Sequence, residues 1–143
     1  DGWTNALIAQ ANGFETYPVL VEGSLADYEN LDNHQTGIHD YFKFLKFGFG
    51  RATDIANNHI RRGRLGRADA LAMVARHDGA FPGVYLGKPI EEILAEIDMT
   101  LEDFERVCDQ FTNKRLFVCD NRGRPVRDAA RNLTLAQPVG TQA

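Results

Sequence analysis

The stretch GIHDYFKFLKFGFGRATD, residues 37–54, most constrains how this chain of 143 residues can fold. Apolar residues recur there at positions i, i+4, i+7 and i+11 of one helical stripe, namely Ile38, Phe42, Leu45 and Phe49. Further aromatic residues broaden the stripe nearly all the way round, namely Tyr41, Phe44 and Phe47. A helix this apolar is expected to be buried on most of its sides.

Two glycines, Gly48 and Gly50, interrupt the helical pattern of this stretch. A glycine inside a helix costs up to about 1 kcal/mol relative to alanine. Their presence therefore predicts a close backbone approach, a kink or a break between two helices. Gly48, Ala52 and Ala56, spaced by four, would form a strip of small residues for a close neighbour.

Further helices are predicted on both sides of this stretch. Residues 24–27, SLAD, have the spacing of a capping box with Asp in place of Glu, and can open a short helix. After residue 54 the helical pattern resumes and ends at Gly63. Apolar spacing and start signals predict the remaining helices over residues 3–12 and 67–77, from Pro89 as a first helical residue, and after Thr100.

Extended structure is expected in two short segments. Residues 17–21, YPVLV, suit either a short strand or an extended connector, and residues 115–127 suit two β runs around a turn that contains glycine. The predicted fold is a mainly α, compact helical domain over residues 1–128 with a small C-terminal β-hairpin. A mobile tail is expected over residues 129–143. Because the chain starts at Asp1 without Met, we expect it to be a piece of a larger protein.

The composition indicates a globular protein without a membrane span. Hydrophobic residues make up 43% and charged residues 25%, and no apolar run approaches the length of a membrane helix. Cys108 and Cys119 form neither a disulfide framework nor a zinc motif, so a reducing cytoplasm is the expected location.

A basic block lies inside this acidic chain of net charge -4. Residues 43–67 hold seven Lys and Arg against the single acid Asp54, whereas residues 1–42 hold seven acids and no Lys or Arg. Such a block is a candidate anion site. Within it, Arg51 and Asp54 are helical neighbours, and an Arg held by an Asp keeps its fork oriented toward a phosphate or carboxylate. The alternative is a surface ion pair worth under roughly 1 kcal/mol.

Other chemistry-bearing residues give weaker signals. A five-residue step does not put His34 and His39 on one helical face, so no metal is expected. His39 next to Asp40 suits a proton carrier or a hydrogen-bonding reader of a sugar, and equally a satisfied residue near a helix start. Cys108 is expected in the core. The chain lacks a nucleophile elbow, a P-loop and a dinucleotide fingerprint.

Residues 86–111 have the helix, turn and helix arrangement of a DNA-reading motif. The second helix, however, carries Arg106 alone against four acids, which phosphates would repel; these are Glu102, Asp103, Glu105 and Asp109. We therefore interpret this segment as a packing motif and expect no nucleic-acid partner.

The stretches GIHDYFKFLKFGFGRATDIANNHIRRGRLGRADAL and YLGKPIEEILAEIDMTLEDFERVCDQFTNKRLF resemble the C-terminal part of the N-acetyl sugar amidotransferases of surface-polysaccharide and nonulosonic-acid biosynthesis. The resemblance covers about residues 22–127. One departure is Gly66, where a Ser or Thr cap is expected before the next helix.

This resemblance implies an ATP-dependent enzyme of the PP-loop pyrophosphatase type that turns a sugar acetamido group into an acetamidino group. The acetamido oxygen is adenylylated, and ammonia from a partner glutaminase then displaces AMP. ATP and Mg²⁺ belong to the full-length enzyme, and none is expected in this fragment, which should be inactive alone because the pyrophosphate loop lies upstream.

The proposed substrate- or phosphate-binding residues are Lys43, Lys46, Arg51 and Asp54, with His39 and Asp40 nearby, while catalytic residues are left unassigned. The sugar is expected to be free or nucleotide-linked, and a homo-oligomer is compatible with an interface left open in the fragment. Two alternatives stay open: a non-catalytic helical module that docks the glutaminase through the aromatic stripe, and a helix-turn-helix nucleic-acid binder.

Overall fold

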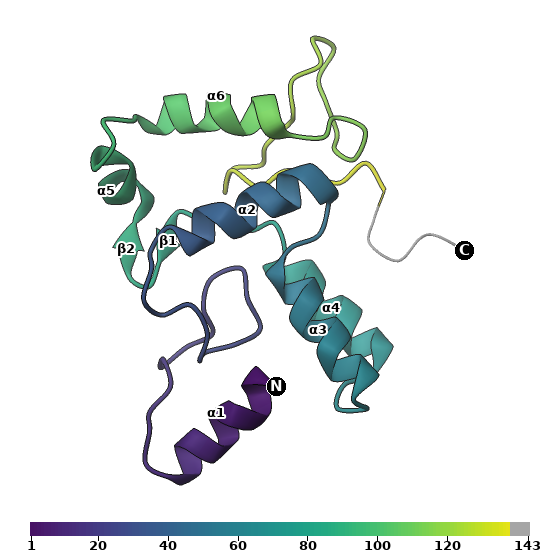
Figure 1. Ribbon diagram of the computed structural model, residues 1–143. Coiled ribbons are helices and arrows are strands. Elements are labelled where there is room, and N and C mark those ends of the chain that lie inside the picture. The colour runs from purple at the N-terminus through teal and green to yellow at the C-terminus, as the bar shows by residue number, and fades with distance from the viewer. Residues whose placement is uncertain (138–143) are drawn as a thin grey trace.

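The computed structural model describes residues 1–137, which form a mainly α domain (Figure 1). The first helix, α1 (Gly2–Ala11), lies at one end of the molecule. After a long connector come α2 (Thr36–Phe47), α3 (Arg51–Arg61) and α4 (Arg67–His77). The strands β1 (Val84–Tyr85) and β2 (Lys88–Pro89) then lead into α5 (Ile90–Ala95) and α6 (Leu101–Phe111).

The helix α2 lies at the centre of the main hydrophobic core. Figure 1 shows α6 running alongside α2, with the C-terminal segment passing near both. Residues from these elements and from α5 form one buried cluster, namely Tyr41, Phe44, Leu45, Ile90, Leu94, Phe104, Cys108, Phe117 and Leu133. The aromatic stripe of the sequence thus anchors α2 in the core, as its spacing predicts.

Part of the predicted burial of α2 is wrong. Phe47 is 60% exposed and Phe49 40% exposed, because α2 ends at Phe47 and the following turn carries both rings out of the core. Gly48 ends α2 in the left-handed conformation, with φ 74°, and Gly50 precedes α3. Of the three predicted roles for the glycines, the break between two helices is confirmed.

The helices α3 and α4 pack closely through small side chains. Ala52 and Ala56 of α3 and Ala70 and Val74 of α4 form a second buried cluster. Two members of the predicted small strip, Ala52 and Ala56, are therefore confirmed at a close helix contact. Gly48 serves a different role, because its Cβ position would face Leu116 and Leu135 instead.

The helix α6 begins where the sequence predicts. The Thr100 hydroxyl accepts a hydrogen bond from the Asp103 N–H at 3.1 Å, and the Thr100 N–H donates to the Asp103 carboxylate at 3.4 Å. Pro89 is the residue immediately before α5 rather than its first helical residue.

The short helix predicted to start at Ser24 is absent from the described residues. The Ser24 hydroxyl accepts from the Ala26 N–H at 3.2 Å, and the Asp27 carboxylate accepts from the Thr16 hydroxyl at 2.9 Å, so neither caps a helix. Residues 17–21 form the extended connector, the second of the two predicted alternatives for that segment.

The C-terminal β structure extends beyond the predicted hairpin. Cys119 pairs with Pro125 across the turn, as expected, but Phe117 pairs with Leu135 and Arg127 with Leu133. Leu133 is buried in the core. Packing therefore continues past the predicted domain boundary at residue 128, and residues 138–143 of the predicted tail lie outside the described residues.

Candidate functional site

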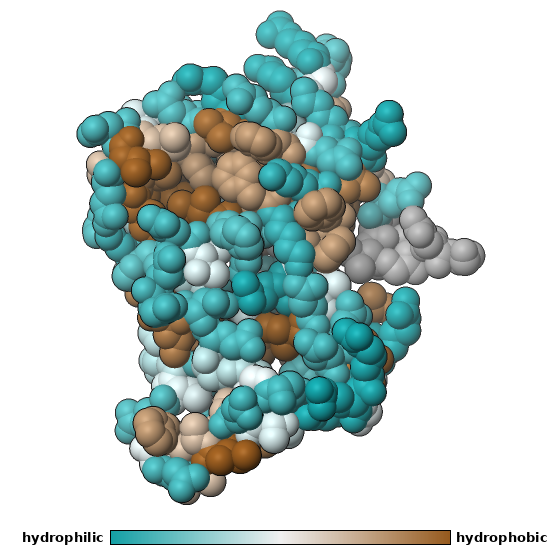
Figure 2. Space-filling view, in the orientation of Figure 1, coloured by the Kyte–Doolittle hydropathy of each residue, from teal (hydrophilic) through white to brown (hydrophobic). Residues whose placement is uncertain are grey.

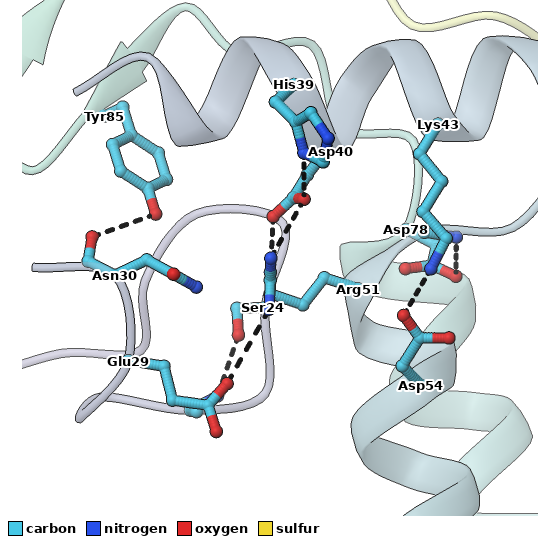
Figure 3. A network of polar contacts seen from close by, with 12 residues as sticks. Ser24, Glu29, Asn30, His39, Asp40, Lys43, Arg51, Asp54, Asp78 and Tyr85 are labelled. Carbon is cyan, nitrogen blue, oxygen red and sulfur yellow. Dashed lines mark hydrogen bonds and ion pairs between the residues drawn. The ribbon is translucent and has the colours of Figure 1, made fainter. Parts of the chain in front are cut away.

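An ion pair between α2 and α3 is the centre of the candidate site (Figure 3). Arg51 donates from Nε to Asp40 Oδ2 at 2.5 Å and from Nη2 to Asp40 Oδ1 at 3.2 Å. Glu29, in the connector before α2, lies 3.7 Å from Arg51 Nη1. The Asp40 side chain is only 11% exposed, so water screens this pair weakly. The hydrogen bonds that Arg51 donates to Asp40 raise the pKa of Arg51, so its guanidinium stays charged.

The start of α3 positions Arg51 for this contact. Gly50 carries no side chain to cap the helix, and Asp78, just after α4, supplies the missing acceptor. Asp78 Oδ2 accepts from the Gly50 N–H at 2.8 Å and from the Thr53 hydroxyl at 2.5 Å. A carboxylate at a helix N-terminus also interacts favourably with the helix dipole. The loop after α4 therefore fixes the helix end from which Arg51 projects.

A cavity of about 530 Å³ opens beside the Arg51–Asp40 pair. Its walls come from residues 20–23, from Gly37, Asp40 and Tyr41 of α2, from Gly50 and Arg51, and from residues 76–85. We call it the Arg51 cavity. Its volume lies in the range of small-molecule pockets.

Tyr85 forms the wall of the Arg51 cavity next to Gly37. A Cβ atom on Gly37 would lie 2.5 Å from the Tyr85 ring, so only glycine permits this contact. The Tyr85 hydroxyl donates to the backbone oxygen of Asn30 at 3.4 Å, which ties β1 to the connector (Figure 3). Burial, with Asp40 close by, raises the pKa of Tyr85 to about 12, so this hydroxyl is a neutral hydrogen-bonding group.

The charges around the Arg51 cavity nearly cancel. Two cations, Arg51 and Arg76, stand against three carboxylates, those of Glu22, Asp40 and Asp78. Asp78 Oδ1 is buried, has no hydrogen-bond partner among the described residues and has almost no accessible surface, so it offers no contact to a ligand in the cavity. The lining therefore suits a neutral, polar ligand better than a polyphosphate.

The predicted pairing of Arg51 with Asp54 is wrong. Asp54 accepts instead from Lys43 of α2, while Arg51 turns to Asp40 and Glu29 (Figure 3). The reason is geometric: after the break at Gly48–Gly50, α3 runs away from α2 at a steep angle (Figure 1), and its first residues meet side chains of α2 at the break, so contacts between the helices replace the local pair.

Of the predicted site residues, the structure brings Asp40 and Arg51 to the cavity, whereas the other four do not line it. His39 touches the pair from outside, with Nδ1 3.1 Å from Asp40 Oδ1 and a side chain 78% exposed. Lys46 lies over the ring of Phe111, with Nζ 5.0 Å from its centroid. The predicted group therefore divides between a cavity and an outer surface.

Two further members of the basic block contact the start of α1. Arg62 and Arg64 reach the Asp1 carboxylate at 2.8 and 3.1 Å, and the Arg64 guanidinium stacks 4.1 Å from the Trp3 ring centroid. These contacts hold the start of α1 against the end of α3. They also neutralise Arg62 and Arg64, two cations of the predicted anion site.

Several residues of the site are not predicted from the sequence: Glu22, Arg76, Asp78 and Tyr85 of the cavity, and Glu29, which contacts Arg51. The uncapped Gly50 is one usable signal, because a helix end without a local cap needs an acceptor from elsewhere. Nothing in the spacing identifies Asp78 as that acceptor, since it follows 28 residues later.

Residues 1–137 contain no group of three or more His, Cys, Asp or Glu side chains arranged to hold a metal ion. Over the same residues, no helix combines the length and the apolar character required to cross a membrane.

The acidic face of α6 binds the C-terminal segment of this chain. Asp109 accepts from Arg127 at 2.5 Å, and Glu105 accepts from Arg131 at 2.6 Å. The opposite face buries Phe104 and Cys108, and burial raises the pKa of the Cys108 thiol to about 12. Both faces of α6 thus serve packing.

These features define a mainly α domain with a cavity of about 530 Å³ at the junction of α2 and α3. Residues 13–131 match the family model described as "LPS biosynthesis protein WbpG-like, C-terminal domain". The chain therefore belongs to this family of lipopolysaccharide biosynthesis domains, which agrees with the resemblance in its sequence. No curated protein matches the chain.

Proposed function

We propose that this chain is the C-terminal domain of an ATP-dependent amidotransferase that converts a sugar acetamido group into an acetamidino group. Its pathway would be the biosynthesis of lipopolysaccharide O-antigen or of a nonulosonic acid. Family membership supports the lipopolysaccharide context, and the sequence resemblance supports the reaction. The observation that carries a direct role for this domain is the Arg51–Asp40 pair at the wall of a cavity of about 530 Å³.

In this proposal the Arg51 cavity receives the sugar ring and its acetamido group. Its apolar wall, which includes the Tyr85 ring, would contact the acetamido methyl group and the ring carbons. Sugar hydroxyls would donate to the carboxylate of Asp40, which lines the cavity and is 11% exposed. The guanidinium of Arg51, oriented by Asp40, would donate to an oxygen of the sugar.

In this proposal ATP and Mg²⁺ bind in the rest of the full-length enzyme. Lys43, Arg62 and Arg64 of the basic block are paired with Asp54 and Asp1, which supports a structural role for these three cations. A glutaminase partner would supply the ammonia, and this chain alone is expected to be inactive.

Kinetics of the full-length enzyme test the proposal. Arg51→Lys keeps the charge but loses the two-point contact with Asp40, and it should raise KM for the sugar at least about tenfold while KM for ATP stays within about twofold. Arg122→Lys is the matched control, because Arg122 is exposed on the C-terminal turn. Unchanged sugar KM in Arg51→Lys would remove this cavity from the substrate site.

A further inference from the structure

Three aromatic side chains remain exposed where the end of α2 meets the end of α6. Phe47 is 60% exposed, Phe111 50% and Phe49 40%. The Phe47 and Phe49 rings lie 6.0 Å apart, and Phe111 packs edge-on against Phe42 at 5.6 Å. Figure 2 shows apolar surface gathered over α2 and α6 on this face of the molecule. Grouped exposed rings of this kind mark an interaction surface.

Two lysines lie over these rings, Lys43 over Phe49 and Lys46 over Phe111. Two further cations, Lys114 and Arg115, follow α6 in the segment next to the end of α2. The three rings and these four cations define the Phe47 patch. Asn113 holds the Lys114–Arg115 segment beside α2, because its N–H donates to the Leu45 oxygen at 2.9 Å and its side chain to the Lys46 oxygen at 3.4 Å.

Most of this positive charge is not neutralised within the domain. Lys43 pairs with Asp54, but Lys46, Lys114 and Arg115 form no ion pair with any residue in the range 1–137. The patch is therefore positive on a chain whose net charge is -4. Charge complementarity selects an acidic partner.

The placement of the lysines distinguishes between acidic partners. Lys43 Nζ lies 4.9 Å from the Phe49 centroid, and Lys46 Nζ lies 5.0 Å from the Phe111 centroid. The ammonium groups thus cover ring faces that a nucleic-acid base would need for stacking. Carboxylates can still reach the ammonium groups from outside, and apolar side chains can contact the free ring edges and Phe47.

We infer that the Phe47 patch docks an acidic, amphipathic segment of another protein, in which carboxylates pair with the patch cations and an apolar side chain packs on Phe47. The docked segment would be a helix with apolar anchors three or four residues apart. The surface is separate from the Arg51 cavity, so this inference stands independently of the proposed reaction.

Selection from a random peptide library tests this inference. The immobilised 143-residue chain is the target, and enriched peptides are synthesised and titrated by fluorescence anisotropy. The enriched peptides should carry net negative charge and apolar residues at helical spacing, and they should bind less tightly as salt rises. Phe47→Ser and Lys46→Glu should each weaken binding at least about tenfold. Phe14→Ser is the matched control, because Phe14 is 71% exposed but lies after α1, outside the patch. The Phe14→Ser variant should bind the peptides as tightly as the unchanged chain does.

Three results would overturn the inference: no enrichment, enrichment without acidic bias, or binding that survives both patch substitutions. A single-stranded thymidine oligonucleotide serves as the competing probe. Oligonucleotide binding that Phe47→Ser abolishes would assign the patch to nucleic acid instead. Thermal unfolding of each variant confirms that it folds, which is expected because both substituted side chains lie on the surface.

Discussion

Arg51 of α3 binds Asp40 of α2 through two hydrogen bonds, of 2.5 and 3.2 Å, across the break that separates the two helices. This contact couples the fold to the site, because it fixes the angle between α2 and α3 and places a charged fork on the cavity wall. Breaking it should therefore affect both stability and binding.

Replacing Arg51 with Met removes the charge and leaves Asp40 largely buried without its partner. We expect the free energy of unfolding to fall by about 1–3 kcal/mol, below the cost of a fully buried pair because the Arg51 side chain is 26% exposed. Urea unfolding measures the change. The control is Arg122→Met, at an exposed position, which should change the free energy of unfolding by less than about 0.5 kcal/mol. An equal loss of stability in both variants would contradict the role of the Arg51–Asp40 pair.

Gly79 is expected to tolerate alanine far less well than Gly13 does. Both have positive φ, 78° and 86°, so both substitutions incur a similar backbone cost of about 1 kcal/mol. A Cβ on Gly79 would lie 2.3 Å from the Phe44 ring, whereas nothing lies within 4 Å of the Gly13 position. Gly79→Ala should therefore cost a further 1–3 kcal/mol or so for the displaced ring. Equal unfolding midpoints for the two variants would show that the loop after α4 moves freely away from α2.

The two cysteines should differ in reactivity. Cys108 is fully buried and burial raises its pKa to about 12, whereas the Cys119 side chain is partly accessible. A thiol-specific chromogenic reagent should therefore label one thiol quickly in the native chain and the second only on unfolding. In Cys119→Ser the fast phase should disappear. A fast phase that persists would place Cys108 within reach of solvent.

Tyr85 should ionise at higher pH than an exposed tyrosine. Its pKa is raised to about 12, against about 10 for the unfolded chain. The neutral hydroxyl is the form favoured by the fold, so its contribution is fully present below about pH 10 and is lost as pH rises toward 12. Ultraviolet difference titration of the native chain and of Tyr85→Phe isolates this transition. A Tyr85 transition near pH 10 would mean that the cavity wall is open to water.

Helices with their own boundary signals are predictable from this sequence. The capping pair of Thr100 and Asp103 fixes the start of α6, and Gly48 and Gly50 indicate an interruption. The sequence does not predict the β1–β2 turn. Leu86 and Gly87 both have positive φ in this turn, 49° and 76°, and leucine rarely adopts that conformation.

Contacts between distant residues are the part that sequence spacing does not reveal. Sequence spacing predicts that Arg51 pairs with Asp54, three residues away. Its actual partners are Asp40 and Glu29, and the turn after α2 brings Arg51 near them. Asp78 caps α3 from beyond α4 in the same way. Asp40 and Arg51 were predicted as site residues, yet their pairing and the cavity beside them depend on tertiary structure.

The most direct test of the account is calorimetric titration of this chain with the candidate acetamido sugar, repeated with Arg51→Met and Asp40→Asn. If the Arg51 cavity holds the sugar, the unchanged chain should bind one sugar per molecule, and both variants should bind it at least about tenfold more weakly. Absence of binding by the chain, or equal binding by all three proteins, would contradict the assignment of this cavity to the substrate.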